Sequence, residues 1–209
     1  MIEGDKSMSD IFAGVRQFQR DVFPEHRELF EQLAAGQSPK AMFVTCSDSR
    51  VDPFLLTQSR PGELFMLRNA GNIVPPYGSG AESEAAVVEY AVNVLRVPEI
   101  IVCGHSGCGT MTALVDPSQA SNLPAMTQWL RHVQRVRESL AGAHALDAPD
   151  AVWQAVEVNV VVQLIHLRTY PFVAEAEQAG RLRLTGWVYD IPTGQVNEYD
   201  DIEQEFRPL

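Results

Sequence analysis

Residues 43–50 read Phe-Val-Thr-Cys-Ser-Asp-Ser-Arg, an apolar run that ends in a thiol, a carboxylate and a guanidinium. The apolar run begins at Ala41 and has the length of a buried strand. Cys46, Asp48 and Arg50 then follow on alternate residues. Because folding does not require this combination at the end of a strand, the stretch is the first candidate for chemistry.

A second reactive stretch follows another apolar run. Residues 99–103 are predicted to form a buried strand, and residues 104–109 continue as Gly-His-Ser-Gly-Cys-Gly. Helical patterns over residues 53–58, 81–95 and 149–167 alternate with such strands, which predicts parallel crossover units. Sites in parallel sheets form at the carboxyl ends of strands, so we expect the two reactive stretches to converge on one point.

The fold class that these patterns predict is α/β, with a central, mainly parallel sheet flanked by helices. Apolar residues at helical spacing over residues 9–22, resuming at 29–33 after an interruption at Pro24, predict an N-terminal helical arm. Residues 181–191 and 195–199 predict a C-terminal strand, turn and strand. A chain of 209 residues fits a single domain, residues 1–209, with residues 1–36 as its arm.

The charge balance excludes several classes of partner. Lysine and arginine total 16 against 27 acidic residues, which gives a net charge of -11. We therefore expect no nucleic acid and no membrane partner, since both favour a basic surface. With no long apolar span and no signal pattern, the chain is expected to be cytoplasmic. Its three cysteines are too few and odd in number for a disulfide framework.

A metal site accounts for two of these cysteines. Cys46, His105 and Cys108 form a Cys2His set, which gives zinc three protein ligands and leaves a fourth position for water or substrate. Taken singly, each residue has an ordinary alternative as a small buried hydrophobe or a satisfied polar group. Their occurrence together at two strand ends favours one catalytic zinc ion per chain. Cys103, inside the strand, is predicted to belong to the core.

Asp48 has two possible roles, as a fourth zinc ligand or as the hydrogen-bond acceptor for a metal-bound hydroxide. Arg50 could decide between them by holding the Asp48 carboxylate off the metal. The alternative is an ordinary surface ion pair of little energetic value. Zinc lowers the pKa of a bound water toward about 7. Because two thiolates neutralise the ion more fully than imidazoles would, we expect activity to rise into mildly alkaline pH.

Several motifs resemble those of the β-class carbonic anhydrases, especially the plant-type and bacterial cyanate-operon branch. The resemblance covers nearly the whole chain, in order and spacing, and rests on Cys46-Ser47-Asp48-Ser49-Arg50, Arg68-Asn69-Ala70-Gly71-Asn72, Glu89-Tyr90-Ala91-Val92, Gly104-His105-Ser106-Gly107-Cys108-Gly109 and Gly186-Trp187-Val188-Tyr189-Asp190. It implies reversible hydration of carbon dioxide to bicarbonate by attack of zinc hydroxide on the carbon.

The same resemblance implies roles for individual residues. Cys46, His105 and Cys108 match the zinc ligands of the family, and Asp48 and Arg50 match its catalytic dyad. Its substrate-binding positions match Gln37, Phe65, Ala70, Tyr90 and Gly109. The family commonly has valine where this chain has Ala70, so a slightly wider pocket is expected. Because the family assembles this pocket across a dimer interface, we expect a homodimer or a higher homo-oligomer.

Two other functions remain open from the sequence. A hydrolase of carbon disulfide, or of a related small heterocumulene, would use the same zinc set, and only substrate access would distinguish it. A non-catalytic zinc or redox-sensing module would also keep the metal ligands. A zinc deaminase is disfavoured because its Pro-Cys-x-x-Cys pattern is missing from the sequence. The glycines of residues 104–109 also lack the spacing of a dinucleotide fingerprint.

Overall fold

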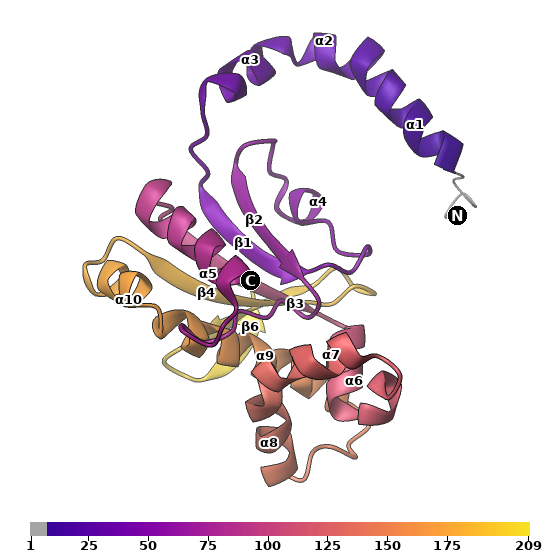
Figure 1. Ribbon diagram of the computed structural model, residues 1–209, viewed down its shortest axis with the longest axis vertical. Helices are drawn as coiled ribbons and strands as arrows, with labels where there is room; N and C mark the ends of the chain where they lie inside the picture. The colour runs from indigo at the N-terminus through magenta and orange to yellow at the C-terminus, as the bar shows by residue number, and fades with distance from the viewer. Residues whose placement is uncertain (1–7) are drawn as a thin grey trace. The chain divides into compact units, whose positions relative to one another are not determined.

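The computed structural model describes residues 8–209, which form two compact units that divide between Gln37 and Ser38 (Figure 1). The first unit is helical and the second contains the whole sheet. The assignment of both units to a single domain stays a prediction.

The first unit is a run of helical segments: α1 (Met8–Gln17), a π-helical turn (Phe18–Val22), α2 (Phe23–Glu25) and α3 (Arg27–Ala35). The predicted interruption at Pro24 is wrong, because the chain stays helical there and breaks at His26. Pro24 lies at the start of α2, where the missing N–H of a proline costs little. Phe23 and Phe30 stack with ring centroids 5.3 Å apart, which ties α2 to α3.

The second unit contains a six-stranded sheet in the order β2-β1-β3-β4-β5-β6. Its strands are β1 (Ala41–Cys46), β2 (Leu64–Asn69), β3 (Glu99–His105), β4 (Arg183–Tyr189), β5 (Val196–Asp200) and β6 (Glu205–Pro208). The first four are parallel, and β5 and β6 add antiparallel pairs at one edge. The predicted α/β fold is therefore confirmed, with one addition. The short, charged strand β6 has no apolar alternation that would have predicted it.

Helices connect and cover the strands. They are α4 (Pro53–Thr57), α5 (Glu82–Glu89) continued by a π-helical turn (Tyr90–Val94), α6 (Gly109–Val115), α7 (Pro124–Trp129), α8 (Gln134–Gly142), α9 (Ala151–Arg168) and α10 (Pro171–Gln178). Helix α9 contacts β3 and β4 of the sheet and also the helices α6, α8 and α10. A 3-10 turn at residues 130–133 separates α7 from α8. Among residues 8–209, no helix combines the length and apolar character needed to cross a bilayer.

The alternation of side chains along β1 and β3 separates two apolar clusters. Met42, Val44 and Cys46 belong to the main core of the unit. Phe43 and Cys103 belong to a second, smaller cluster. Because successive side chains of a strand point to opposite faces, Cys103 lies on the other side of the sheet from Cys46. Cys103 is fully buried in this cluster, as predicted for a core residue.

Helix α9 lies very close to the sheet at Gly104. A methyl group at Gly104 would meet Val156 Cγ1 at 2.8 Å and Val160 Cγ2 at 3.0 Å. The change Gly104→Ala is therefore expected to push α9 from β3 and to lower the free energy of unfolding by about 1–3 kcal/mol. Urea unfolding followed by circular dichroism measures this loss. Gly142→Ala, at the end of α8 with open space around it, is the control. Equal stability of the two variants would contradict the close packing.

Candidate metal centre

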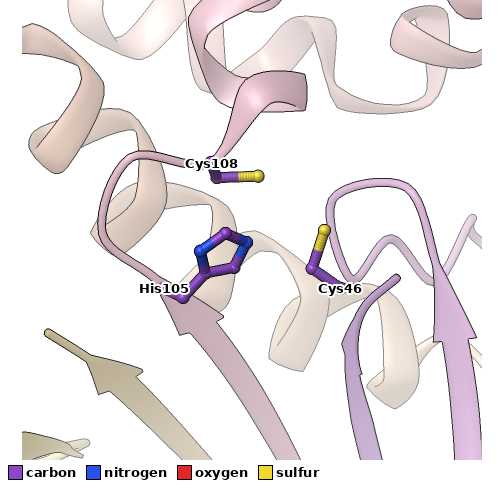
Figure 2. Close-up of side chains that lie close together, drawn as sticks. All are labelled: Cys46, His105 and Cys108. Atoms are coloured by element: carbon purple, nitrogen blue, oxygen red, sulfur yellow. The ribbon is translucent and has the colours of Figure 1, made fainter. Parts of the chain in front are cut away.

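Three buried side chains converge at the carboxyl ends of two neighbouring strands. Cys46 ends β1, His105 ends β3, and Cys108 directly precedes α6. Figure 2 shows the three side chains pointing toward one another. One ligand atom of each lies within 4.8 Å of the others, and no other such group of three or more was found among residues 8–209. The next strands, β2 and β4, lie on opposite sides of this pair, so the site occupies the switch point where ligands bind in parallel sheets.

His105 presents an unpaired nitrogen at this point. Its Nδ1 lies 3.0 Å from the carbonyl oxygen of Ser106. Because a carbonyl only accepts, Nδ1 carries the proton and Nε2 is left with its lone pair. Nε2 is buried and has no hydrogen-bond partner among residues 8–209. A buried polar atom without a partner is costly, and a metal ion would satisfy it.

A hydrogen bond between the two thiols shifts the pKa of both. The pKa of Cys46 lies below its ordinary value, chiefly because the Cys108 thiol donates to its sulfur, with a further contribution from the Gly71 amide. The Gly71 N–H donates to Cys46 Sγ at 3.3 Å. The same pairing of the thiols, together with burial, raises the pKa of Cys108. A deprotonated thiol is the form of cysteine that binds a metal cation. Two sulfurs and one imidazole nitrogen therefore fit a tetrahedral metal such as zinc.

Asp48 lies at the edge of the metal group, by which we mean Cys46, His105 and Cys108, and Arg50 holds its carboxylate. The Arg50 Nε and Nη2 groups donate to the two carboxylate oxygens at 3.0 and 2.7 Å, and the Arg50 amide donates to Oδ1 at 2.9 Å. Nη2 also donates to the carbonyl of Gly107 at 3.0 Å. The Arg50 guanidinium holds the pKa of Asp48 well below its usual range. Asp48 is therefore charged, and its Oδ2 lies 3.9 Å from His105 Nε2.

The sequence did not reveal how Arg68 contributes to the site. From the end of β2, its guanidinium donates to the carbonyl oxygens of Cys46, Asp48 and Val51 at 2.9–3.0 Å. Arg68 thus fixes the backbone of the stretch that carries both a metal ligand and the carboxylate. In the sequence, this role of Arg68 was signalled by a charged residue at the end of a mostly apolar strand. Its importance depends on the pairing of Thr45 with Arg68 in the sheet.

The predicted substrate-binding residues are placed less completely. The rings of Phe65 and Tyr90 stack with centroids 5.9 Å apart, and 44% of the Tyr90 surface is exposed. The carbonyl of Ala70 accepts a hydrogen bond from Trp129 Nε1 at 2.8 Å, and Gly109 begins α6. Gln37 belongs to the first unit, so its role beside the metal group stays a prediction.

The fold and the metal group define an α/β protein with a candidate metal site at the ends of β1 and β3. Residues 41–196 match the family model described as carbonic anhydrase. A carbonic anhydrase of Pseudomonas aeruginosa is 50% identical over 205 residues, covering 97% of this chain and 92% of the relative. Carbonic anhydrase 1 of Escherichia coli O157:H7 is 45% identical over 202 residues, with the same two coverages.

Solved structures extend this comparison to the fold. The β-carbonic anhydrase CcaA superposes with a TM-score of 0.93 at 43% identity, covering 97% of this chain and 92% of that one. A tetrameric β-carbonic anhydrase of the ascomycete Sordaria macrospora gives a TM-score of 0.74 at 30% identity, covering 91% of this chain and 92% of that one. The chain therefore belongs to the carbonic anhydrase family, in its β class.

Proposed function

We propose that this chain catalyses the reversible hydration of carbon dioxide to bicarbonate and a proton, with one zinc ion held by Cys46, His105 and Cys108. The observation that carries the proposal is the buried Cys2His group, in which His105 Nε2 has no hydrogen-bond partner among residues 8–209. The family supports the reaction, since the relatives compared above are named carbonic anhydrases.

The chain's own residues provide orientation and charge. When bound, zinc supplies a Lewis acid that makes water a nucleophile near neutral pH. Asp48, kept ionised by Arg50, would accept a hydrogen bond from the nucleophilic water and so direct a lone pair of that water toward the substrate carbon. Arg50 holds both carboxylate oxygens and keeps Asp48 outside the ligand set. Of the two roles open for Asp48, this geometry favours that of acceptor.

The proposal includes a homodimer or a higher homo-oligomer with the substrate pocket at the interface between subunits. In the single chain, the helix α1 leaves Ile11, Phe12 and Val15 between 52% and 61% exposed. Apolar surface of this kind is typical of an interaction site. The pocket would use Gln37, Phe65, Ala70, Tyr90 and Gly109. The tetrameric Sordaria enzyme supports assembly.

Because cysteine ligands must stay reduced, we place the protein in the cytoplasm.

A stopped-flow hydration assay and a metal analysis on the same sample test the proposed reaction. We expect about one zinc per chain, hydration that rises in proportion to zinc content, and no turnover of carbon disulfide. Turnover of carbon disulfide without hydration would assign the chain to the hydrolase alternative. Full zinc content with neither reaction would leave a non-catalytic binding module, and a sample that binds no zinc would overturn the proposal.

A further inference from the structure

Helix α9 buries a row of polar side chains inside an otherwise apolar core. Asn159, Gln163 and His166 are 0%, 0% and 3% exposed. Their spacing of four and three residues places them on one face of the helix. We call these three residues the α9 ladder. Burying polar groups costs free energy unless each finds a hydrogen-bond partner, so the partners of the ladder reveal what it holds.

Those partners lie in the loop that follows β2. Asn159 Nδ2 donates to the carbonyl of Gly71 at 3.0 Å, and Gln163 Nε2 donates to Asn159 Oδ1 at 2.8 Å. The amide of Val74 donates to Gln163 Oε1 at 2.8 Å. His166 Nδ1 in turn donates to the carbonyl of Val74 at 2.9 Å. The ladder therefore binds the loop backbone at two points, Gly71 and Val74.

The start of this loop, at Gly71, contacts the metal group. The amide of Gly71 donates to Cys46 Sγ at 3.3 Å, while Asn159 holds the carbonyl of the same residue. Gly71 has a φ of +84°, and a methyl group there would lie 2.7 Å from Thr110 Cγ2. The residue is thus confined between the start of α6 and the ladder. The carbonyl and the N–H of Gly71 belong to adjacent peptide planes that meet at its Cα, so the hydrogen bond on the carbonyl restrains the direction of the N–H through the φ and ψ angles of Gly71.

We propose that Asn159 and Gln163 are positioning residues for the metal centre, which aim the Gly71 N–H at the Cys46 sulfur and thereby set the affinity for the metal. The inference rests on the proposed function, because it takes Cys46 as a metal ligand. A hydrogen bond from an N–H group to a ligating sulfur draws negative charge from the sulfur and fixes the orientation of the cysteine side chain. Loss of such an outer partner typically weakens metal binding by about 10- to 100-fold.

The packing of α9 does not explain the ladder. The helix docks on the sheet through apolar contacts, with Val156 and Val160 over Gly104 and with Val160 and Leu164 over Gly186. Apolar side chains of similar volume at positions 159 and 163 would keep these contacts. The hydrogen bonds of the ladder go to the loop and not to the sheet.

The test removes the ladder's hydrogen bonds while keeping its volume. Asn159→Leu and Gln163→Met are compared with Gln154→Met, which changes a glutamine of the same helix whose side chain donates to Asp150 Oδ1 at 3.0 Å. Zinc affinity is measured by competition with a chelator, and the cobalt-substituted protein is examined for its sulfur-to-cobalt charge-transfer band. We expect both ladder variants to bind zinc at least about 10-fold more weakly than the parent protein and to show a shifted charge-transfer band. The control should match the parent protein.

The outcomes separate this inference from the function beneath it. If the unaltered chain binds no zinc, the proposed function fails. If the chain binds zinc but folded Asn159→Leu keeps the same affinity and the same band, the inference is overturned, even if the variant melts at a lower temperature. If Asn159→Leu does not fold, Asn159→Ser removes the amide without adding apolar bulk and is judged by the same two measurements.

Discussion

Cys108→Ser is expected to lose zinc and the hydration of carbon dioxide together. A serine hydroxyl is not a zinc ligand at neutral pH, so only Cys46 and His105 would remain in the buried group. The change also removes the thiol that donates to the Cys46 sulfur and lowers its pKa. Loss of an outer partner already costs about 10- to 100-fold in affinity, and loss of a direct ligand should exceed the upper end of that range.

Metal content and stopped-flow hydration on the same preparation measure this effect. Cys103→Ser is the matched control, because it changes the same residue type in the second cluster, away from the metal group. It should keep zinc and activity while losing stability, since a hydroxyl in an apolar cluster costs about 1–3 kcal/mol. A Cys108→Ser protein that retains one zinc per chain would remove Cys108 from the ligand set.

The sequence was sufficient to predict the parallel sheet and the metal group, for a physical reason. A buried parallel strand is a continuous apolar run, so a thiol or an imidazole directly after it stands out. The carboxyl ends of such strands share one edge of the sheet. Two reactive stretches far apart in the chain, at Cys46 and at His105 to Cys108, could therefore be brought together without knowing any other contact.

The supports of the site could not be predicted in the same way. The hydrogen bonds from Arg68 to the Cys46 carbonyl and from Asn159 to the Gly71 carbonyl join residues 22 and 88 positions apart. They depend on strand register and on how α9 is rotated against the sheet. The apolar pattern of α9 predicts burial but not which buried atoms its polar residues would satisfy. The place of Gln37 depends on the arrangement of units and subunits, which no local pattern encodes.

Arg50→Ala is expected to keep zinc but to lose turnover. Arg50 touches none of the three metal ligands in the described hydrogen bonds, so metal content should stay near one per chain. Without the guanidinium, both oxygens of Asp48 lose their side-chain donors, and Oδ1 keeps the backbone amide at position 50. Asp48 Oδ2 already lies 3.9 Å from His105 Nε2, so the carboxylate can turn toward the metal and occupy the position that water needs. We expect kcat/KM to fall by about 100-fold or more, the lower end of the range for a side chain positioned against the reacting group.

Two further variants show whether turnover depends on the paired hydrogen bonds from the Arg50 guanidinium to Asp48 or only on its positive charge. Arg50→Lys keeps the positive charge but cannot bond both carboxylate oxygens in one plane, so it should recover only part of the activity. Arg60→Ala, which removes an exposed arginine 3.9 Å from Glu63, should leave hydration unchanged. Full activity of Arg50→Ala at full zinc content would exclude Asp48 and Arg50 as a working pair. Activity lost in proportion to zinc would show instead that Arg50 supports metal binding.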